Sequence, residues 1–180
     1  MAGWLKPDIT LDASVAKARL LAAGKAFDQG KLLYLIGSGL LSWIMRNFEQ
    51  GGIEHPWAPL AASTIAGRRK GSSSILQDTG RLKQSFVVDA RATSGFVDVG
   101  TRDPRAGWHH FGTAPYEIRP RGRSPLTFLT AGGERMFRRH VHHPGLTPRR
   151  IWPSRQVALD IAQRSVETYV NEALRSSRGT

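Results

Sequence analysis

Apolar positions in the first third of the chain follow a helical period. They recur every three or four positions over residues 11–27 and again over residues 31–50, where a pair of glycines ends the pattern. The sequence therefore predicts two consecutive amphipathic helices, the first capped by Asp8 or Thr10. Residues 32–45 form an uncharged run of about 14 residues, fewer than the roughly 18 needed to cross a bilayer. We expect a buried helix here and no contact with a membrane.

After these helices the pattern changes to loops and short alternating strands. Residues 53–74 are rich in glycine, proline, serine and basic side chains, with one short helical stretch at 60–66, which is typical of an exposed arm. Alternating apolar residues at 86–90 and 95–101 predict a β-hairpin. Ser154 is expected to cap a final helix. Further strands are expected at 116–119, 126–129 and 134–141.

This order of elements predicts an α+β fold. N-terminal helices and a C-terminal helix should pack on a small, mostly antiparallel sheet, with long exposed loops. A chain of 180 residues is long enough to bury a core of its own. We therefore expect residues 1–180 to form a single domain, with the exposed arm at 53–74.

Charge is distributed unevenly along the chain. The formal net charge is +12, and residues 102–150 hold ten arginines against three acidic residues. Guanidinium groups suit phosphate, but few aromatic residues are interleaved with them, so contact with a nucleic-acid backbone is expected rather than base readout. Pairing with acidic neighbours in an assembly is an equally weighted alternative. The chain has no cysteine, which excludes disulfides and thiolate metal sites, and its first residues predict no secretory signal.

Candidate catalytic groups do not form a recognisable set. His140 and His142 can share one strand face, but few carboxylates lie nearby in sequence, so we expect no metal site and no cofactor. The sequence contains no Gly-x-Ser-x-Gly motif of the kind that exposes a nucleophilic serine. Ser85 and His109 alone are therefore no evidence for a nucleophile and its base. Residues 37–39, Gly-Ser-Gly, lie inside the second predicted helix, where small residues more often permit close packing than bind phosphate. The sequence predicts a protein that is not an enzyme.

One connected set of short motifs runs through the middle of the chain. It starts with Trp-Ala-Pro-Leu at 57–60, continues with Ile-Leu-Gln-Asp-Thr-Gly-Arg-Leu at 75–82, and ends with His109 and the pair Phe111-Gly112. As a set, these motifs resemble the phage virion morphogenesis family, also called tail completion proteins. A late proline-arginine segment resembles the family too, with Ile151 or Trp152 as its apolar anchor. The residues that carry the resemblance are Trp57, Pro59, Leu60, Leu76, Thr79, Gly80, Leu82, Ser85, Gly100, His109, Phe111 and Gly112.

The resemblance implies a structural virion protein of a tailed bacteriophage. Such a protein would complete the tail, as a tail terminator, or join head to tail, as a neck or head-tail connector component, in a ring around the DNA path. We expect it to be made in the host cytoplasm, to form a homo-oligomeric ring, a hexamer by the symmetry of tails, and to contact other phage neck and tail proteins. A basic nucleic-acid-binding protein unrelated to virion assembly is the alternative, and a metal-dependent nuclease using the histidines ranks third. The arginines expected to face double-stranded DNA or an adjoining ring are Arg119, Arg121, Arg123, Arg138 and Arg139.

Overall fold

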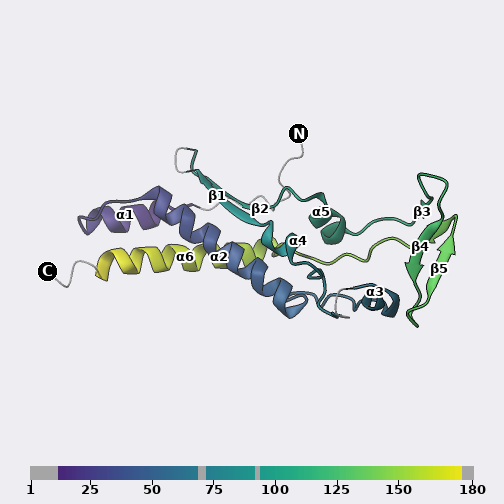
Figure 1. The fold of residues 1–180 in the computed structure, drawn as a ribbon. Coiled ribbons are helices and arrows are strands. Elements are labelled where there is room, and N and C mark those ends of the chain that lie inside the picture. The colour runs from purple at the N-terminus through teal and green to yellow at the C-terminus, as the bar shows by residue number, and fades with distance from the viewer. Residues whose placement is uncertain (1–11, 69–71, 92–93, 176–180) are drawn as a thin grey trace. The chain divides into compact units, whose positions relative to one another are not determined.

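The computed structural model describes residues 12–68, 72–91 and 94–175 (Figure 1). They fall into two compact units, which we describe separately. Unit 1 comprises Met1–Arg46, Phe86–Arg102 and Trp152–Thr180, and unit 2 comprises Asn47–Ser85 and Asp103–Ile151. The expectation of a single domain stays a prediction.

Three helices build unit 1: α1 (Ser14–Ala22), the greater part of α2 (Gln29–Gln50) and α6 (Arg155–Arg175). They confirm the helices predicted from apolar periodicity. The predicted caps Asp8 and Thr10 lie outside the described residues. In the structure, α1 has Ala13 at its N-cap position without a side-chain hydrogen bond. Ser154 does cap α6, because its Oγ accepts from the Val157 amide at 3.4 Å.

The core of unit 1 lies where these helices meet. Leu20 of α1, Leu32 of α2 and Val170 of α6 are each 2 % exposed or less. Tyr169 of α6 packs edge-to-face on Phe27, with ring centroids 6.1 Å apart, and its hydroxyl accepts from the Asp28 amide at 2.6 Å. Burial of each large apolar side chain contributes about 1.5–3 kcal/mol, so this cluster holds the three helices together.

The predicted hairpin is present in unit 1 as β1 (Val87–Arg91) and β2 (Phe96–Gly100), which pair antiparallel with Val88 opposite Val99. The glycine-rich stretch of α2 lets other elements approach closely. A Cβ at Gly37 would lie 2.5 Å from Val88 and 2.8 Å from Val97, and one at Gly39 would lie 3.0 Å from Ile161 of α6. Small residues at 37–39 therefore serve close packing, as their position within a helix indicated.

The described residues of unit 2 form three short helices: α3 (Ala62–Ala66), α4 (Arg81–Gln84) and α5 (Pro104–Phe111). The first matches the short helical stretch expected inside the 53–74 arm, and none of its residues is buried. Within the same segment, Trp57 is only 6 % exposed. The segment thus combines an exposed helix with a buried tryptophan.

The strands of unit 2 form two ribbons, each made of two antiparallel strands. β3 (Tyr116–Ile118) pairs with β6 (Val141–His143), and β4 (Leu126–Leu129) pairs with β5 (Arg135–Arg138). The stretch 134–141, expected as one strand, is therefore divided between two ribbons. The reason is local, because the turn at 130–134, closed by the Thr130 amide bonding to the Glu134 carbonyl at 2.9 Å, pairs β4 with β5. The α+β class is confirmed, and the strands of the described residues form three two-stranded antiparallel sheets.

Candidate functional site

The family-type motifs gather in unit 2 around a buried tryptophan. Trp57 packs edge-to-face on Phe48, with ring centroids 5.6 Å apart, and its Nε1 donates to the Arg150 carbonyl at 3.2 Å. Ile151 and Trp152, the two alternatives for the apolar anchor of the late segment, are both buried, and Ile151 lies in unit 2. The tryptophan motif and the late proline-arginine segment, far apart in sequence, thus meet in one cluster.

Asn47 is the polar centre of this cluster, and sequence reasoning missed it. The side chain is 1 % exposed and makes three hydrogen bonds. Its Nδ2 donates to the carbonyls of Arg150 at 2.8 Å and Ile151 at 3.0 Å, and its Oδ1 accepts from the Ile53 amide at 2.7 Å. The available signal was a lone asparagine among the apolar positions of α2, close to Ile44 and Phe48.

The Leu-Gln-Asp-Thr-Gly-Arg-Leu motif positions α4. Leu82 is 7 % exposed, and Gln77 donates from Nε2 to the Phe48 carbonyl at 2.8 Å. Gly80 occupies the N-cap position of this helix with a φ of 73°. The left-handed backbone at that position favours glycine. Leu76 also adopts a positive φ, 58°, which is uncommon for a residue with a side chain.

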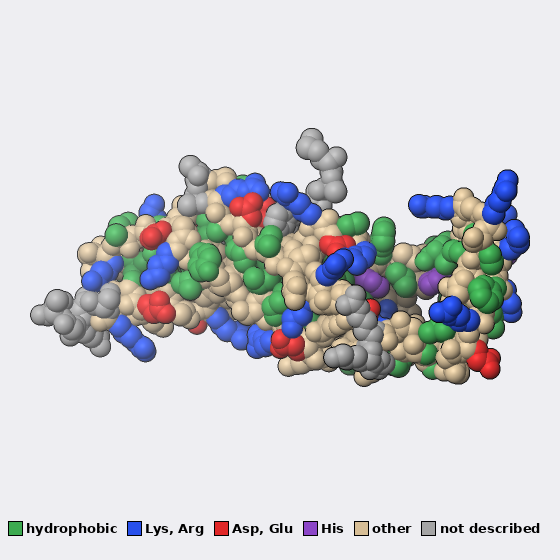
Figure 2. All heavy atoms as spheres, viewed as in Figure 1, with side chains coloured by type: hydrophobic (Ala, Val, Ile, Leu, Met, Phe, Trp, Pro, Cys, Tyr) green, Lys and Arg blue, Asp and Glu red, His purple; other side chains and the backbone are tan. Residues whose placement is uncertain are grey.

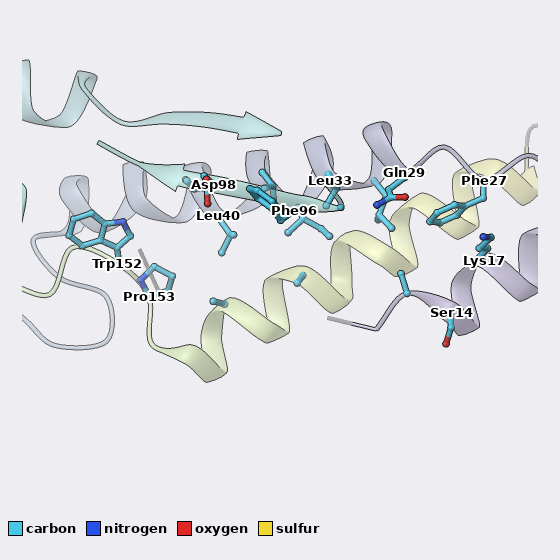
Figure 3. Close-up of a pocket in the computed structure, with 18 of the residues that line it drawn as sticks. Ser14, Lys17, Phe27, Gln29, Leu33, Leu40, Phe96, Asp98, Trp152 and Pro153 are labelled. Atoms are coloured by element: carbon cyan, nitrogen blue, oxygen red, sulfur yellow. The ribbon is translucent and has the colours of Figure 1, made fainter. Parts of the chain in front are cut away.

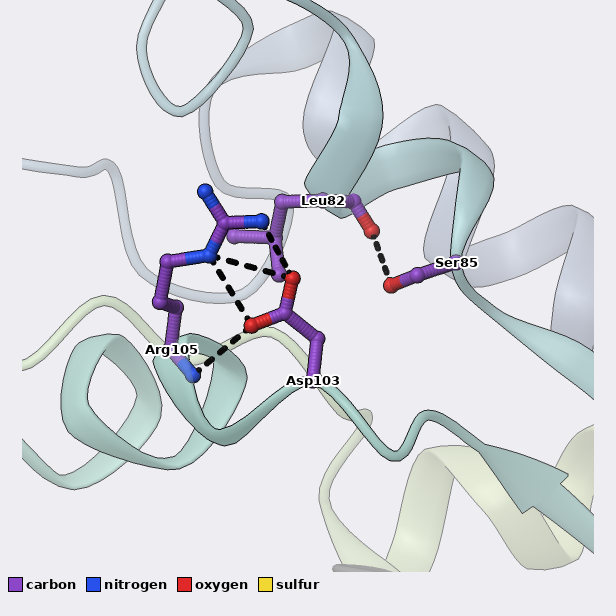
Figure 4. Close-up of polar contacts among 4 residues, drawn as sticks. All are labelled: Leu82, Ser85, Asp103 and Arg105. Carbon is purple, nitrogen blue, oxygen red and sulfur yellow. Dashed lines mark hydrogen bonds and ion pairs between the residues drawn. The ribbon is translucent and has the colours of Figure 1, made fainter.

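Two polar motif groups close local turns (Figure 4). The Ser85 hydroxyl donates to the Leu82 carbonyl at 2.7 Å, at the end of α4. Asp103 caps α5 by accepting from the Arg105 amide at 3.0 Å, and its carboxylate also accepts from the Arg105 guanidinium, 2.9 Å from Nε. That guanidinium hydrogen bond lowers the pKa of Asp103. In this arrangement the serine hydroxyl terminates a helix.

The two histidines of α5 point toward the protein interior. His110 accepts the Ile151 amide at its Nδ1, 3.0 Å away, and burial together with the Arg150 charge lowers its pKa to about 4. Burial, followed by the charges of Arg149 and Arg105, lowers the pKa of His109. Both imidazoles are therefore neutral near pH 7, and His110 acts as an acceptor for a backbone amide.

Gly112 ends α5 in a conformation that requires glycine. Its φ and ψ are 77° and −177°, and a Cβ there would overlap the Leu146 carbonyl oxygen. The next residue, Thr113, pairs with Leu146 through two backbone hydrogen bonds of 3.1 and 3.2 Å. Phe111, which precedes this glycine, is 61 % exposed.

The other motif residues do not join the cluster. Gly100 belongs to unit 1, where it ends β2. Pro59 and Thr79 are exposed, and Leu60 is half-buried.

The histidines considered as metal ligands lie on the β3–β6 ribbon. His140 and His142 both contact the carboxylate of Glu117, with His142 Nδ1 2.8 Å from Oε1. The hydrogen bond to His142, then the neighbouring histidine and arginine charges, lower the pKa of this exposed carboxyl. Within residues 12–68, 72–91 and 94–175, no group of three or more His, Asp or Glu side chains is arranged to hold a metal ion.

The predicted arginines lie on and beside the β4–β5 ribbon, and all five are exposed. Residues 116–143 contain six arginines, two glutamates and no lysine. Figure 2 shows Lys and Arg side chains gathered around this ribbon together with apolar side chains, which include Phe128 at 38 % and Phe137 at 55 % exposure. The ribbon therefore presents a mixed surface of guanidinium and aromatic groups.

Comparison with protein families identifies the class to which this fold and these motifs belong. The model of the phage virion morphogenesis family matches residues 15–168, and the chain belongs to this family. It is thus a bacteriophage protein with a role in virion assembly. Searches of curated proteins and of solved structures gave no match. In the part of the chain that the structure describes, no helix has the length and apolar character needed to span a membrane.

Proposed function

We propose that this protein completes the tail or joins head to tail, acting as a homo-oligomeric ring around the DNA path and not as an enzyme. Family membership gives the role in virion assembly. The observation that carries the finer proposal is the exposed arginine and aromatic surface of the β4–β5 ribbon in a chain with a net charge of +12.

The chemistry of the motif residues supports a structural role. Trp57 and His110 are engaged with backbone groups of residues 150 and 151, and Gly80 and Gly112 adopt backbone conformations that favour glycine. The Ser85 hydroxyl donates to the Leu82 carbonyl at the end of α4. These residues stabilise unit 2, and the exposed β4–β5 ribbon is the surface available for contacts with other molecules.

The expected partners are further copies of this chain, other neck and tail proteins of the phage, and genomic double-stranded DNA passing through the ring. Repeating a positive surface around a closed ring concentrates positive potential, and DNA in the channel or acidic surfaces on an adjoining ring would compensate it. A nucleic-acid-binding protein without an assembly role is the competing function, and the arginine content is the observation that favours it.

Two measurements test the proposal. Light scattering on purified protein over a range of concentrations should reveal a closed oligomer, and electron microscopy of virions should place a ring at the head-tail junction or tail end. Gel shifts with double-stranded DNA at several salt concentrations separate the competing function, since an independent DNA-binding protein binds as a monomer with a steep salt dependence. Monomer at every concentration, with no such ring in virions, would refute the proposal.

A charge-reversal variant tests the arginines of the loop that joins β3 to β4, beside the β4–β5 ribbon. Arg119→Glu, Arg121→Glu and Arg123→Glu together change exposed side chains, so the fold and the far-ultraviolet circular dichroism spectrum should be unchanged. If these side chains face DNA, virions should assemble but retain or eject the genome poorly. If they face an acidic ring, heads and tails should fail to join. Normal infectivity would show that this loop contacts neither partner.

A further inference from the structure

Helix α5 exposes its large aromatic side chains and turns its histidines inward. Its large aromatic residues, Trp108 and Phe111, are 54 % and 61 % exposed and lie three positions apart on the outer side of the helix. Its polar histidines are turned inward, where His110 bonds the Ile151 amide. Outward aromatic side chains beside inward polar ones are typical of a surface that another protein covers, because aromatic residues are enriched in interface centres.

Unit 1 contains an apolar pocket of about 630 Å³ (Figure 3). Its walls come from α1, α2, β2 and the start of α6, and they include Leu33, Leu40 and Phe96. Ser14 and Lys17, both exposed, also line it, so the pocket reaches the surface formed by the residues that the structure describes. A pocket of this size accommodates one or two aromatic side chains.

Charge decides which exposed apolar groups can meet a second copy of so basic a chain. Phe128 and Phe137 lie on a ribbon that carries a formal excess of arginine. Contacts of this ribbon with another copy would face like-charge repulsion.

The α5 helix and the pocket carry less excess charge than the ribbon. In α5 the charge of Arg105 is balanced by Asp103, and the lowered pKa values of His109 and His110 keep both rings neutral near pH 7, while Arg149 and Arg150 lie beside these rings. The pocket lining holds one basic and one acidic residue, Lys17 and Asp98. Helix α5 with its N-cap and the lining of the pocket therefore each have no net formal charge.

We propose that Trp108 and Phe111 of one copy insert into the apolar pocket of unit 1 in the next copy. This inference rests on the proposed self-assembly and specifies its contact. The contact joins different surfaces of identical chains, and such heterologous contacts generate a ring when the rotation from one copy to the next closes. Two aromatic side chains supply about 150–250 Å² each, against roughly 800 Å² per partner in a stable interface. They would thus form the centre of the interface, the place where aromatic anchors contribute most of the affinity.

Light scattering on matched variants tests how much the two aromatic side chains contribute to self-association. The double variant Trp108→Ala with Phe111→Ala should weaken self-association by about 30-fold or more, the effect expected from removing interface hot spots. The control Tyr34→Ala removes an equally exposed aromatic side chain (62 %) from α2, outside the pocket lining and the ribbon, and should leave association unchanged. Both variants should keep the circular dichroism spectrum of the parent protein. Association unchanged in the double variant, or weakened equally by the control, would overturn the proposal.

Cross-linking tests the geometry, and the absence of native cysteine makes it direct. A chain carrying Ser14→Cys at the pocket rim is mixed with a differently tagged chain carrying Pro104→Cys, an exposed position of α5 one turn before Trp108, and the mixture is treated with a short bis-maleimide. A mixed dimer should form, whereas Ser124→Cys, exposed in the ribbon loop, should give none with Ser14→Cys. A link formed only within a chain carrying both cysteines would overturn the intermolecular contact. If wild-type protein assembles without the mixed dimer, this contact is wrong and the proposed ring stands; if wild-type protein never assembles, both fail.

Discussion

Replacing Asn47 with alanine should destabilise unit 2 strongly. The substitution removes three buried hydrogen bonds of 2.7 to 3.0 Å, which join the end of α2 to the backbone at Ile53, Arg150 and Ile151. Each contributes about 1 kcal/mol net, and a buried group left without its partner costs about 1–3 kcal/mol. The Arg150 carbonyl keeps its bond from Trp57. We therefore expect a loss of about 3 kcal/mol in the free energy of unfolding.

Urea denaturation followed by tryptophan fluorescence measures the total effect, and hydrogen exchange of the Ile53 amide measures the local one. That amide donates to Asn47, so its exchange should accelerate by about 100-fold if 3 kcal/mol is lost. The control Asn171→Ala changes an exposed asparagine of α6 and should alter stability by less than about 0.5 kcal/mol. A loss below about 1 kcal/mol for Asn47→Ala, with Ile53 exchange unchanged, would refute the view that this side chain ties the segments together.

Two further predictions concern the end of α5. Gly112→Ala places a Cβ against the Leu146 carbonyl in a backbone region that is essentially limited to glycine, so thermal denaturation should show a loss of about 3 kcal/mol or more; Gly122→Ala, with open space around its Cβ, should change little, and equal effects would contradict the argument. For His110, the pKa in the folded protein is about 4, below the ordinary value of 6.5, so the unfolded chain binds the proton more readily. Stability should be fully present above pH 6.5 and fall as the pH drops from 6.5 to about 4. Titration by NMR should place the His110 pKa near 4, and His110→Gln should flatten the pH dependence of stability; a pKa near 6.5 would contradict the buried acceptor role.

The charge distribution bears on how the ring is held together. An arginine-rich surface repels its own copies, so it suits a partner that is negative, whereas a contact between copies needs surfaces that are balanced in charge. In this chain the two kinds of surface are carried by different elements, the β4–β5 ribbon and α5. In the proposed assembly the β4–β5 ribbon contacts a negatively charged partner, and α5 contacts another copy of the chain.

The sequence by itself determined the local elements and the family. The periodicity of residues 11–27 and 31–50, and the alternation around 86–101, predicted α1, α2 and the β1–β2 hairpin, because the side chains that form one face of a helix or strand are set by neighbours in the chain. The use of small residues at 37–39 for close packing followed from the same pattern. The motif set was sufficient to indicate the virion morphogenesis family.

Only the tertiary structure decided which distant segments meet. Asn47 resembles any polar residue in an apolar helix until residues 150 and 151 are placed against it. Likewise, β3 pairs with β6 across the intervening β4–β5 ribbon, with Tyr116 opposite His143. The exposure of Trp108 and the burial of its histidine neighbours depend on which side of α5 faces Ile151. Such contacts join residues separated by tens of positions, and their energies arise from burial and hydrogen bonding that no local pattern encodes.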